Sequence, residues 1–128
     1  MRIVKVLLVS PDPKTREMMQ LAVADLARDG DVEFVEASNG ELGVRRAWKD
    51  LPDIVIADEI SSRAGAFALA HELRGAPEPF TGVIVILLDR RHDAWLAKWS
   101  GADAWFVKPV DPFALTEKVR HLLERAPV

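Results

Sequence analysis

Cysteine is absent from this chain of 128 residues. A disulfide framework, a thiol nucleophile and a cysteine-ligated zinc site are therefore excluded, and the composition is consistent with a reducing cytoplasm. Long hydrophobic runs are also lacking, because none approaches the ~18 residues of a membrane-spanning helix. The apolar run at residues 3–9 is too short for a secretory signal and has no small-residue cleavage site. We expect a cytoplasmic protein with no membrane partner.

A large excess of one charge is missing as well. The 17 Lys and Arg residues nearly balance the 20 Asp and Glu residues, which leaves a net charge of −3. No basic field is available to hold a nucleic-acid backbone, so we expect no nucleic-acid partner. Hydrophobic residues make up 49% and charged residues 29%, which excludes disorder, collagen and coiled coil. The length suits one domain over residues 1–128.

Motifs for catalysis are lacking too. No glycine-rich phosphate loop follows the first apolar run, and no G-x-S-x-G elbow is present for Ser-His-Asp catalysis. The three histidines, His71, His92 and His121, show no ligand spacing. These absences predict a protein that is not an enzyme and that has no resident cofactor.

Short runs rich in apolar and β-branched residues recur along the chain. Three of them are continuously apolar, which is typical of strands buried on both faces of a parallel sheet. We expect strands at residues 3–9, 32–37, 53–57, 83–88 and 104–107.

Helical patterns fill the intervals between these strands. Pro13 opens the first, and Gly30 lies just past its expected end; Pro52 and Gly101 stop two others. The expected helices cover residues 13–28, 41–49, 64–73, 93–100 and 112–125. Regular alternation predicts an α/β fold with one parallel sheet and helices on both of its faces. In such a fold the functional site lies beyond the carboxyl ends of the strands.

Two charged residues stand at neighbouring strand ends in this arrangement. Asp58 directly follows the third strand, and Lys108 follows the fifth. Their side chains can meet across the mouth of the sheet. Position alone leaves two interpretations open, a structural ion pair and a functional site.

Three segments carry a resemblance to a known family. They are residues 36–41 (EASNGE), 52–58 (PDIVIAD) and 101–109 (GADAWFVKP), in that order along the chain. Together they resemble the receiver domain of two-component response regulators, over almost the whole chain. The resemblance implies the flavodoxin-like (CheY-like) fold, a doubly wound (βα)5 architecture with strand order 2-1-3-4-5.

The resemblance also implies roles for individual residues. Asp58 holds the position of the phosphoacceptor, which receives a phosphoryl group from a histidine kinase. Lys108 holds the position of the lysine that contacts the phosphoryl oxygens. Trp105 holds the position of the aromatic switch residue, and Leu87 that of the Ser or Thr that hydrogen-bonds the phosphoryl group.

The chain departs from the family pattern where the family binds Mg²⁺. The acidic pair after the first strand falls on Ser10 and Pro11, which leaves Asp12 as the only acid in that loop. Mg²⁺ needs near-octahedral oxygen coordination with one or two carboxylates. Asp12 and Asp58, helped by the carbonyl of Ile60, are therefore the candidate ligands of a weak site that we expect to be unoccupied.

Two further departures affect the phosphoryl group itself. The switch position, Leu87, is aliphatic and offers no hydrogen bond, and its neighbours Ile86 and Leu88 are aliphatic too. The family's Met-Pro after the phosphoacceptor is replaced by Ser61-Ser62.

Aromatic residues gather where receivers bind partners. Trp95 and Trp99 lie four residues apart on the helix expected at 93–100, and Trp105 lies on the next strand. In the family, the face made by these elements and the last helix binds partners or a second copy, and aromatics are enriched in interface cores. Packing of these indoles on the sheet remains the alternative.

These observations predict a degenerate receiver, or pseudo-receiver. It keeps the fold and the Asp58–Lys108 pair, has weak or no Mg²⁺-dependent phosphorylation, and acts by contact with a histidine kinase or a downstream signalling protein. Two alternatives stay open. One is a working phosphoacceptor that uses Mg²⁺ and Asp58; the other is a sensor whose altered pocket binds a small ligand.

Overall fold

The computed structural model describes residues 2–24, 26, 30–59 and 65–125. Strands and helices alternate along this part of the chain, as the sequence predicts. The strands are β1 (Arg2–Val9), β2 (Gly30–Ala37), β3 (Ile54–Asp58), β4 (Val83–Leu88) and β5 (Ala104–Val107). The helices are α1 (Pro13–Ala22), α2 (Gly40–Asp50), α3 (Ala66–Gly75), α4 (Ala94–Ser100) and α5 (Pro112–Arg125), with a short 3₁₀ turn, η1 (Arg91–Asp93), before α4.

The five strands form one parallel sheet in the order β2-β1-β3-β4-β5. This confirms the expected fold class and strand order. Every residue of β3 and β4 is buried, because helices cover both faces of the sheet and no side of a central strand meets water. The continuous apolar runs in the sequence are the signature of this burial.

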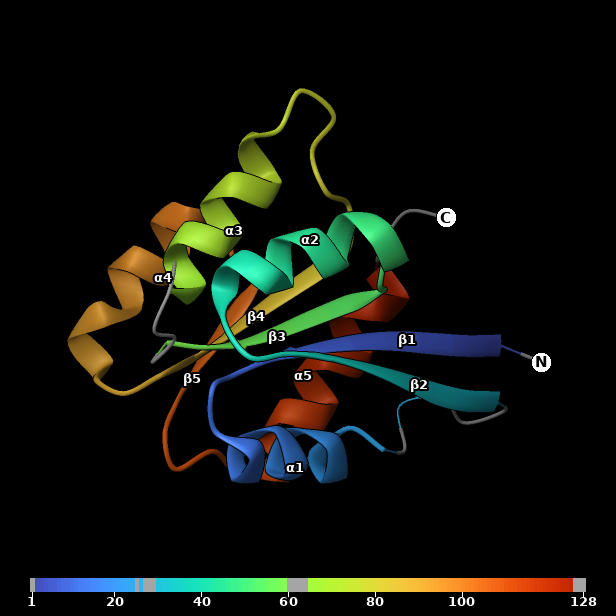
Figure 1. Cartoon of the computed structure of the whole chain (residues 1–128). Helices are drawn as coiled ribbons and strands as arrows, with labels where there is room; N and C mark the ends of the chain where they lie inside the picture. Colours follow the sequence, from blue (N-terminus) through green and yellow to red (C-terminus); the bar gives the residue numbers. More distant parts are fainter. Residues whose placement is uncertain (1, 25, 27–29, 60–64, 126–128) are drawn as a thin grey trace.

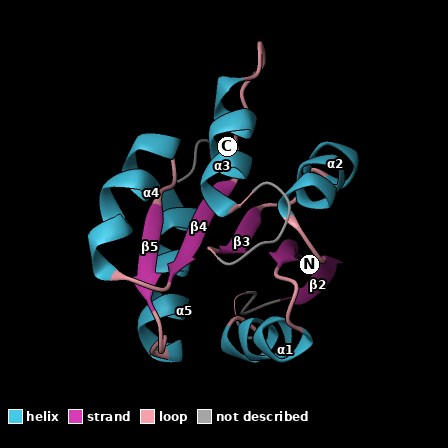
Figure 2. Cartoon of the chain, turned by 60° about the vertical axis from the view of Figure 1, so that its left-hand side comes forward, coloured by secondary structure: helices cyan, strands magenta, loops and turns pink. Residues whose placement is uncertain are grey.

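The helices form a layer on each side of the sheet (Figures 1 and 2). On one side, α2, α3 and α4 close a core that includes Ala47, Leu69 and Ala97. On the other, α1 and α5 close a second core that includes Met19 and Leu115. All strands point the same way, so their carboxyl ends form one rim. Among the residues described, no helix is long and apolar enough to span a bilayer.

Helix α1 ends earlier than the sequence pattern indicated. It stops at Ala22 rather than near residue 28, and Gly30, expected just past its end, begins β2. The backbone N–H of Val23 closes the last turn on the carbonyl of Met19. The hydroxyl of Thr116 on α5 contacts the carbonyl oxygen of Ala22, which satisfies a terminal acceptor that a helix leaves free.

Helix α2 begins and ends with identifiable local devices. The side chain of Asn39 accepts a hydrogen bond of 2.9 Å from the N–H of Leu42 and so caps the helix start. Leu51 closes the end in the left-handed conformation, at φ 47° and ψ 58°, although its side chain is exposed. A residue with a Cβ adopts this conformation at a cost. The turn places α2 against the sheet next to α3.

Candidate functional site

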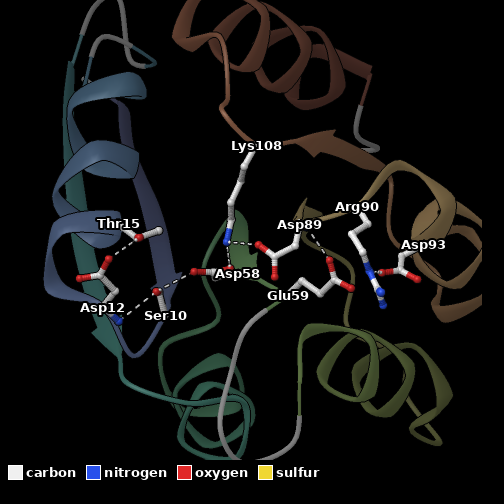
Figure 3. A network of polar contacts seen from close by, with 9 residues as sticks. All are labelled: Ser10, Asp12, Thr15, Asp58, Glu59, Asp89, Arg90, Asp93 and Lys108. Atoms are coloured by element: carbon white, nitrogen blue, oxygen red, sulfur yellow. Dashed lines mark hydrogen bonds and ion pairs between the residues drawn. The ribbon is translucent and has the colours of Figure 1, made fainter.

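Four polar side chains meet at the carboxyl rim of the sheet (Figure 3). Ser10 follows β1, Asp58 ends β3, Asp89 follows β4 and Lys108 follows β5. Asp58 is only 3% exposed and Ser10 is fully buried. A parallel sheet brings these positions together because all of its strands end at the same rim.

Lys108 binds two carboxylates at once. Its Nζ donates to Asp58 Oδ1 in a short contact and to Asp89 Oδ1 at 3.0 Å. Burial opposes the charged form of Lys108, but the hydrogen bonds to Asp58 and Asp89 outweigh it and raise its pKa above the ordinary lysine value. The predicted meeting of Asp58 and Lys108 is therefore found, and Asp89 is a partner that the sequence reasoning did not assign.

Ser10 supplies a second hydrogen bond to the carboxylate of Asp58. Its hydroxyl donates to Asp58 Oδ2 at 2.9 Å, and its oxygen accepts from the N–H of Asp12 at 3.1 Å. The resemblance to receiver domains implies an acid at this position, so a hydroxyl donor stands here in place of a carboxylate. The carboxylate of Asp58 thus contacts an ammonium through one oxygen and a hydroxyl through the other.

Asp12 is turned away from Asp58. It is the N-cap of α1, where one oxygen accepts from the N–H of Lys14 at 3.1 Å and the other from the hydroxyl of Thr15 at 2.9 Å. The hydrogen bond from Thr15, followed by that from Lys14, lowers the pKa of Asp12 below the ordinary aspartate value. Figure 3 shows its carboxylate beside Thr15 rather than at the rim.

The donor set at the rim is a poor fit to Mg²⁺. Within residues 2–24, 26, 30–59 and 65–125, no cluster of three acidic or histidine side chains is placed to hold a metal ion. Asp12 is used in helix capping, and Lys108 already brings a positive charge to Asp58. The two candidate ligands, Asp12 and Asp58, are therefore not brought together. Mg²⁺ requires several oxygen donors in octahedral geometry, which this arrangement does not supply. Ile60, Ser61 and Ser62 lie outside the described residues.

An acidic pair extends the network toward α4. Glu59 accepts a hydrogen bond of 2.6 Å from the N–H of Asp89 through Oε2. Burial, and next the hydrogen bond with Asp93, raise the pKa of Glu59, while that same hydrogen bond lowers the pKa of Asp93. Arg90 lies 3.4 Å from Asp93. Sequence spacing offered no signal for this pair, because the two acids are 34 positions apart on different elements.

Apolar side chains occupy the switch position and its surroundings. Leu87 pairs directly with Asp58 across β3 and β4 and is fully buried. Its neighbours Ile86 and Leu88 are also fully buried. Trp105 of β5 pairs with Ile86 of β4. Its half-buried side chain packs against the core on the α2–α3–α4 side. No hydroxyl is supplied by this part of β4.

Trp95 and Trp99 project from α4 into solvent, with exposed fractions of 65% and 60%. They do not pack on the sheet, which was the alternative left open by the sequence. The indole of Trp99 stacks on the imidazole of His71 from α3, with ring centroids 4.3 Å apart. The two exposed indoles therefore form a surface with α3 on one flank.

The sequence of the chain is similar to those of response regulatory proteins. An uncharacterised response regulatory protein of Mycobacterium tuberculosis is 31% identical over 125 residues, covering 96% of this chain and 92% of that protein. The alkaline phosphatase synthesis transcriptional regulatory protein PhoP of Bacillus subtilis is 24% identical over 97% of this chain and 50% of its own length. No family model matches the chain.

Solved structures show the same fold. A proposed response regulator of Chloroflexus aurantiacus has a TM-score of 0.85 at 25% identity, covering 97% of this chain and 100% of that one. The chemotaxis protein CheY4 of Vibrio cholerae has a TM-score of 0.78 at 23% identity, covering 98% and 100%. The second likeness concerns the fold alone.

Proposed function

Because the chain belongs to the response regulator family as a receiver (CheY-like) domain of two-component signalling, we propose that it is a pseudo-receiver. In this proposal the domain signals by binding other proteins, with weak or no Mg²⁺-dependent phosphorylation of Asp58, and it acts in the cytoplasm. The observation that carries the proposal lies at the end of β1, where the hydroxyl of Ser10 donates to Asp58 and the carboxylate of Asp12 caps α1, in place of an acidic pair.

The second carboxylate that a divalent cation would need is missing on the β1 side of the rim. Ser10 offers a hydroxyl in place of a carboxylate, and the carboxylate of Asp12 caps α1. A phosphoryl group on Asp58 would also lie beside the side chain of Leu87 and gain no hydrogen bond there. Both effects disfavour phosphorylation.

The same rim supports a fixed conformation. The ion pairs of Lys108 with Asp58 and Asp89 join the ends of β3, β4 and β5. The hydrogen bond from Ser10 to Asp58 links the end of β1 to them. A receiver that exchanges between conformations must rearrange this rim. We therefore propose that this chain stays in one conformation, which its partners recognise.

Receiver domains interact with histidine kinases and downstream proteins, and the partner surface of this chain is part of the proposal. The exposed indoles of Trp95 and Trp99 on α4, beside Trp105 on β5, favour contact with a partner or a second copy through the α4–β5–α5 face. Large aromatics anchor interfaces well because they bury much area with few rotatable bonds.

The test is phosphorylation by a small phosphodonor. The protein is incubated with acetyl phosphate and Mg²⁺, and the intact mass is measured over time. We expect no stoichiometric gain of a phosphoryl group. The Asp58→Asn variant is the matched control, since it removes the acceptor and keeps the side-chain volume.

A variant with the missing groups restored makes a negative result informative. Ser10→Asp and Pro11→Asp supply the acidic pair, and Leu87→Thr supplies the hydroxyl. We expect this triple variant to gain phosphorylation that depends on Mg²⁺ and on Asp58. Stoichiometric phosphorylation of the unmodified chain would overturn the pseudo-receiver proposal.

That outcome would support the second candidate, a working phosphoacceptor. One observation favours it: Asp58 and Lys108 keep the pairing at the rim that the family uses. The two candidates differ only in whether the rim accepts a phosphoryl group, so one mass measurement separates them.

A further inference from the structure

Helix α4 exposes its largest side chains and buries small ones. Ala97 and Ser100 are buried, whereas Trp95 and Trp99 are 65% and 60% exposed. Burying an indole removes far more apolar surface from water than burying the side chain of alanine or serine, so folding alone favours the opposite arrangement. The exposure of two indoles on one short helix therefore indicates a role outside the fold.

The two indoles lie on one side of α4 and are partly fixed there. They are four residues apart, which places them about one helical turn from each other. Helix α3 lies beside α4 on the same face of the sheet (Figure 2), and the ring of its His71 stacks nearly parallel to that of Trp99, at an angle of 11°. An aromatic side chain that is already ordered loses little conformational entropy on binding.

Two cations flank the indoles without an acidic partner. Arg91 of η1 and Lys98 of α4 are exposed, and neither forms an ion pair with any residue that the structure describes. The one acid of η1 and α4, Asp93, is buried and lies beside Arg90. A locally positive surface remains, in a chain whose net charge is −3. We call this surface the α4 face; it consists of His71, Arg91, Trp95, Lys98 and Trp99.

The charge of the α4 face distinguishes between a second copy and another protein. In a twofold contact the same surface is used by both copies. A face that carries the cations Arg91 and Lys98 and no acid would then oppose positive charge to positive charge, which disfavours association. The face instead suits a partner that brings acidic side chains.

The spacing of the indoles favours a helical partner. Residues i and i+4 of an amphipathic helix form an apolar stripe with the same spacing as Trp95 and Trp99. A helix that lies along α4 therefore brings one apolar side chain to each indole. Aromatic anchors of interfaces are typically surrounded by polar contacts, and Arg91 and Lys98 supply such contacts at the edge of this face.

We propose that the α4 face binds an acidic amphipathic helix of another protein. Apolar side chains of that helix contact Trp95 and Trp99, and its carboxylates pair with Arg91 and Lys98. No covalent bond is made or broken. The inference rests on the part of the proposed function in which this domain acts by binding other proteins. It adds the chemistry of the partner and the place of contact, which is centred on α4 and extends toward α3.

The test is a titration of the ¹⁵N-labelled protein with a synthetic helical peptide of about 15 residues. The peptide carries leucine at i, i+3, i+4 and i+7 spacing and glutamate at most other positions. EDTA is present, so that Mg²⁺-dependent phosphorylation of Asp58 does not contribute. We expect saturable shifts of the indole N–H signals of Trp95 and Trp99, while the indole signal of Trp48 on α2 stays in place.

Two further probes separate the contributions of charge and of partner class. A peptide with lysine in place of every glutamate keeps the leucine stripe but opposes the cations of the face. It should bind at least about tenfold more weakly. Vesicles of phosphatidylcholine and phosphatidylserine present negative charge without a helix, and the protein should not sediment with them.

Lys98→Glu is the test variant, because it reverses a charge of the α4 face and leaves both indoles in place. It should weaken binding of the acidic peptide about three- to tenfold and strengthen binding of the lysine peptide. Lys14→Glu reverses the charge of an exposed lysine on α1, on the other side of the sheet. It is the matched control and should bind as the unmodified chain does. Trp95→Ala should weaken binding of both peptides, because both use the apolar contact.

Four results would overturn the proposal. They are shifts that do not saturate, equal affinity for the two peptides, equal weakening by the two lysine substitutions, and sedimentation of the protein with the vesicles. Indole shifts that depend on protein concentration without peptide would assign the face to a second copy and overturn it as well. None of these results changes the intact-mass test of Asp58, so failure here is distinct from failure of the pseudo-receiver proposal. Unchanged melting temperatures of the variants exclude unfolding as a cause.

Discussion

Replacing Lys108 with methionine tests the ion bridge at the rim. The substitution keeps the length of the side chain and removes its charge, so that Asp58, whose side chain is 4% exposed, loses its ammonium partner. Breaking a buried pair costs about 3–5 kcal/mol. Lys108 is 25% exposed and Ser10 still donates to Asp58. We therefore expect the free energy of unfolding to fall by about 2–3 kcal/mol, which is at or below the lower end of that range.

For a domain of this size, such a loss lowers the melting temperature by about 10 °C. Urea unfolding measures the free energy directly, and the same substitution is repeated in an Asp58→Asn background. There only the partly exposed contact between Lys108 and Asp89 is removed, at a cost of about 1 kcal/mol or less. Equal costs in the two backgrounds, or a cost below about 0.5 kcal/mol in the first, would refute the reasoning.

Three further predictions concern stability elsewhere. Leu51→Gly should stabilise the chain by about 0.5–1 kcal/mol, because glycine adopts the left-handed conformation without a Cβ clash; a lower urea midpoint would contradict this. Gly43→Ala should destabilise it by about 1–3 kcal/mol, since the new Cβ would lie 2.7 Å from Leu69 and 3.0 Å from Val9; thermal melting measures the loss, and an unchanged melting temperature would be the failure. Asp12→Ala should lower the melting temperature near pH 7. The pKa of Asp12 is lowered by folding, so its contribution is complete above the unfolded-state pKa and disappears as the pH falls through the folded-state pKa; a difference between the two proteins that persists at lower pH would count against the cap.

The central strands were predictable because burial on both faces leaves continuous apolar runs such as Val83–Leu88. The meeting of Asp58 and Lys108 was predictable because parallel strands end at one rim. The strand order came from resemblance, since periodicity carries no information about which strands are neighbours.

Other features depend on contacts distant in sequence. Helix α1 stops at Ala22, where a hydroxyl from Thr116, 94 positions later, contacts its last carbonyl. Asp12 precedes a proline that opens a helix, and an acid there can cap the helix or reach toward a metal. Only the structure shows that it caps the helix. Asp89, the second partner of Lys108, also stands at a strand end, but the sequence did not indicate that its side chain points toward Lys108.

The most direct measurement is the NMR signal of the Lys108 ammonium group. The central claim is that the carboxylate of Asp58 is held by this ammonium and by the hydroxyl of Ser10, with no divalent cation bound beside it. We predict a Lys108 side-chain resonance that is protected from exchange with water, is lost from its position in Asp58→Asn, and does not move when Mg²⁺ is added. A rapidly exchanging ammonium, or a saturable displacement of this resonance by Mg²⁺, would contradict the account.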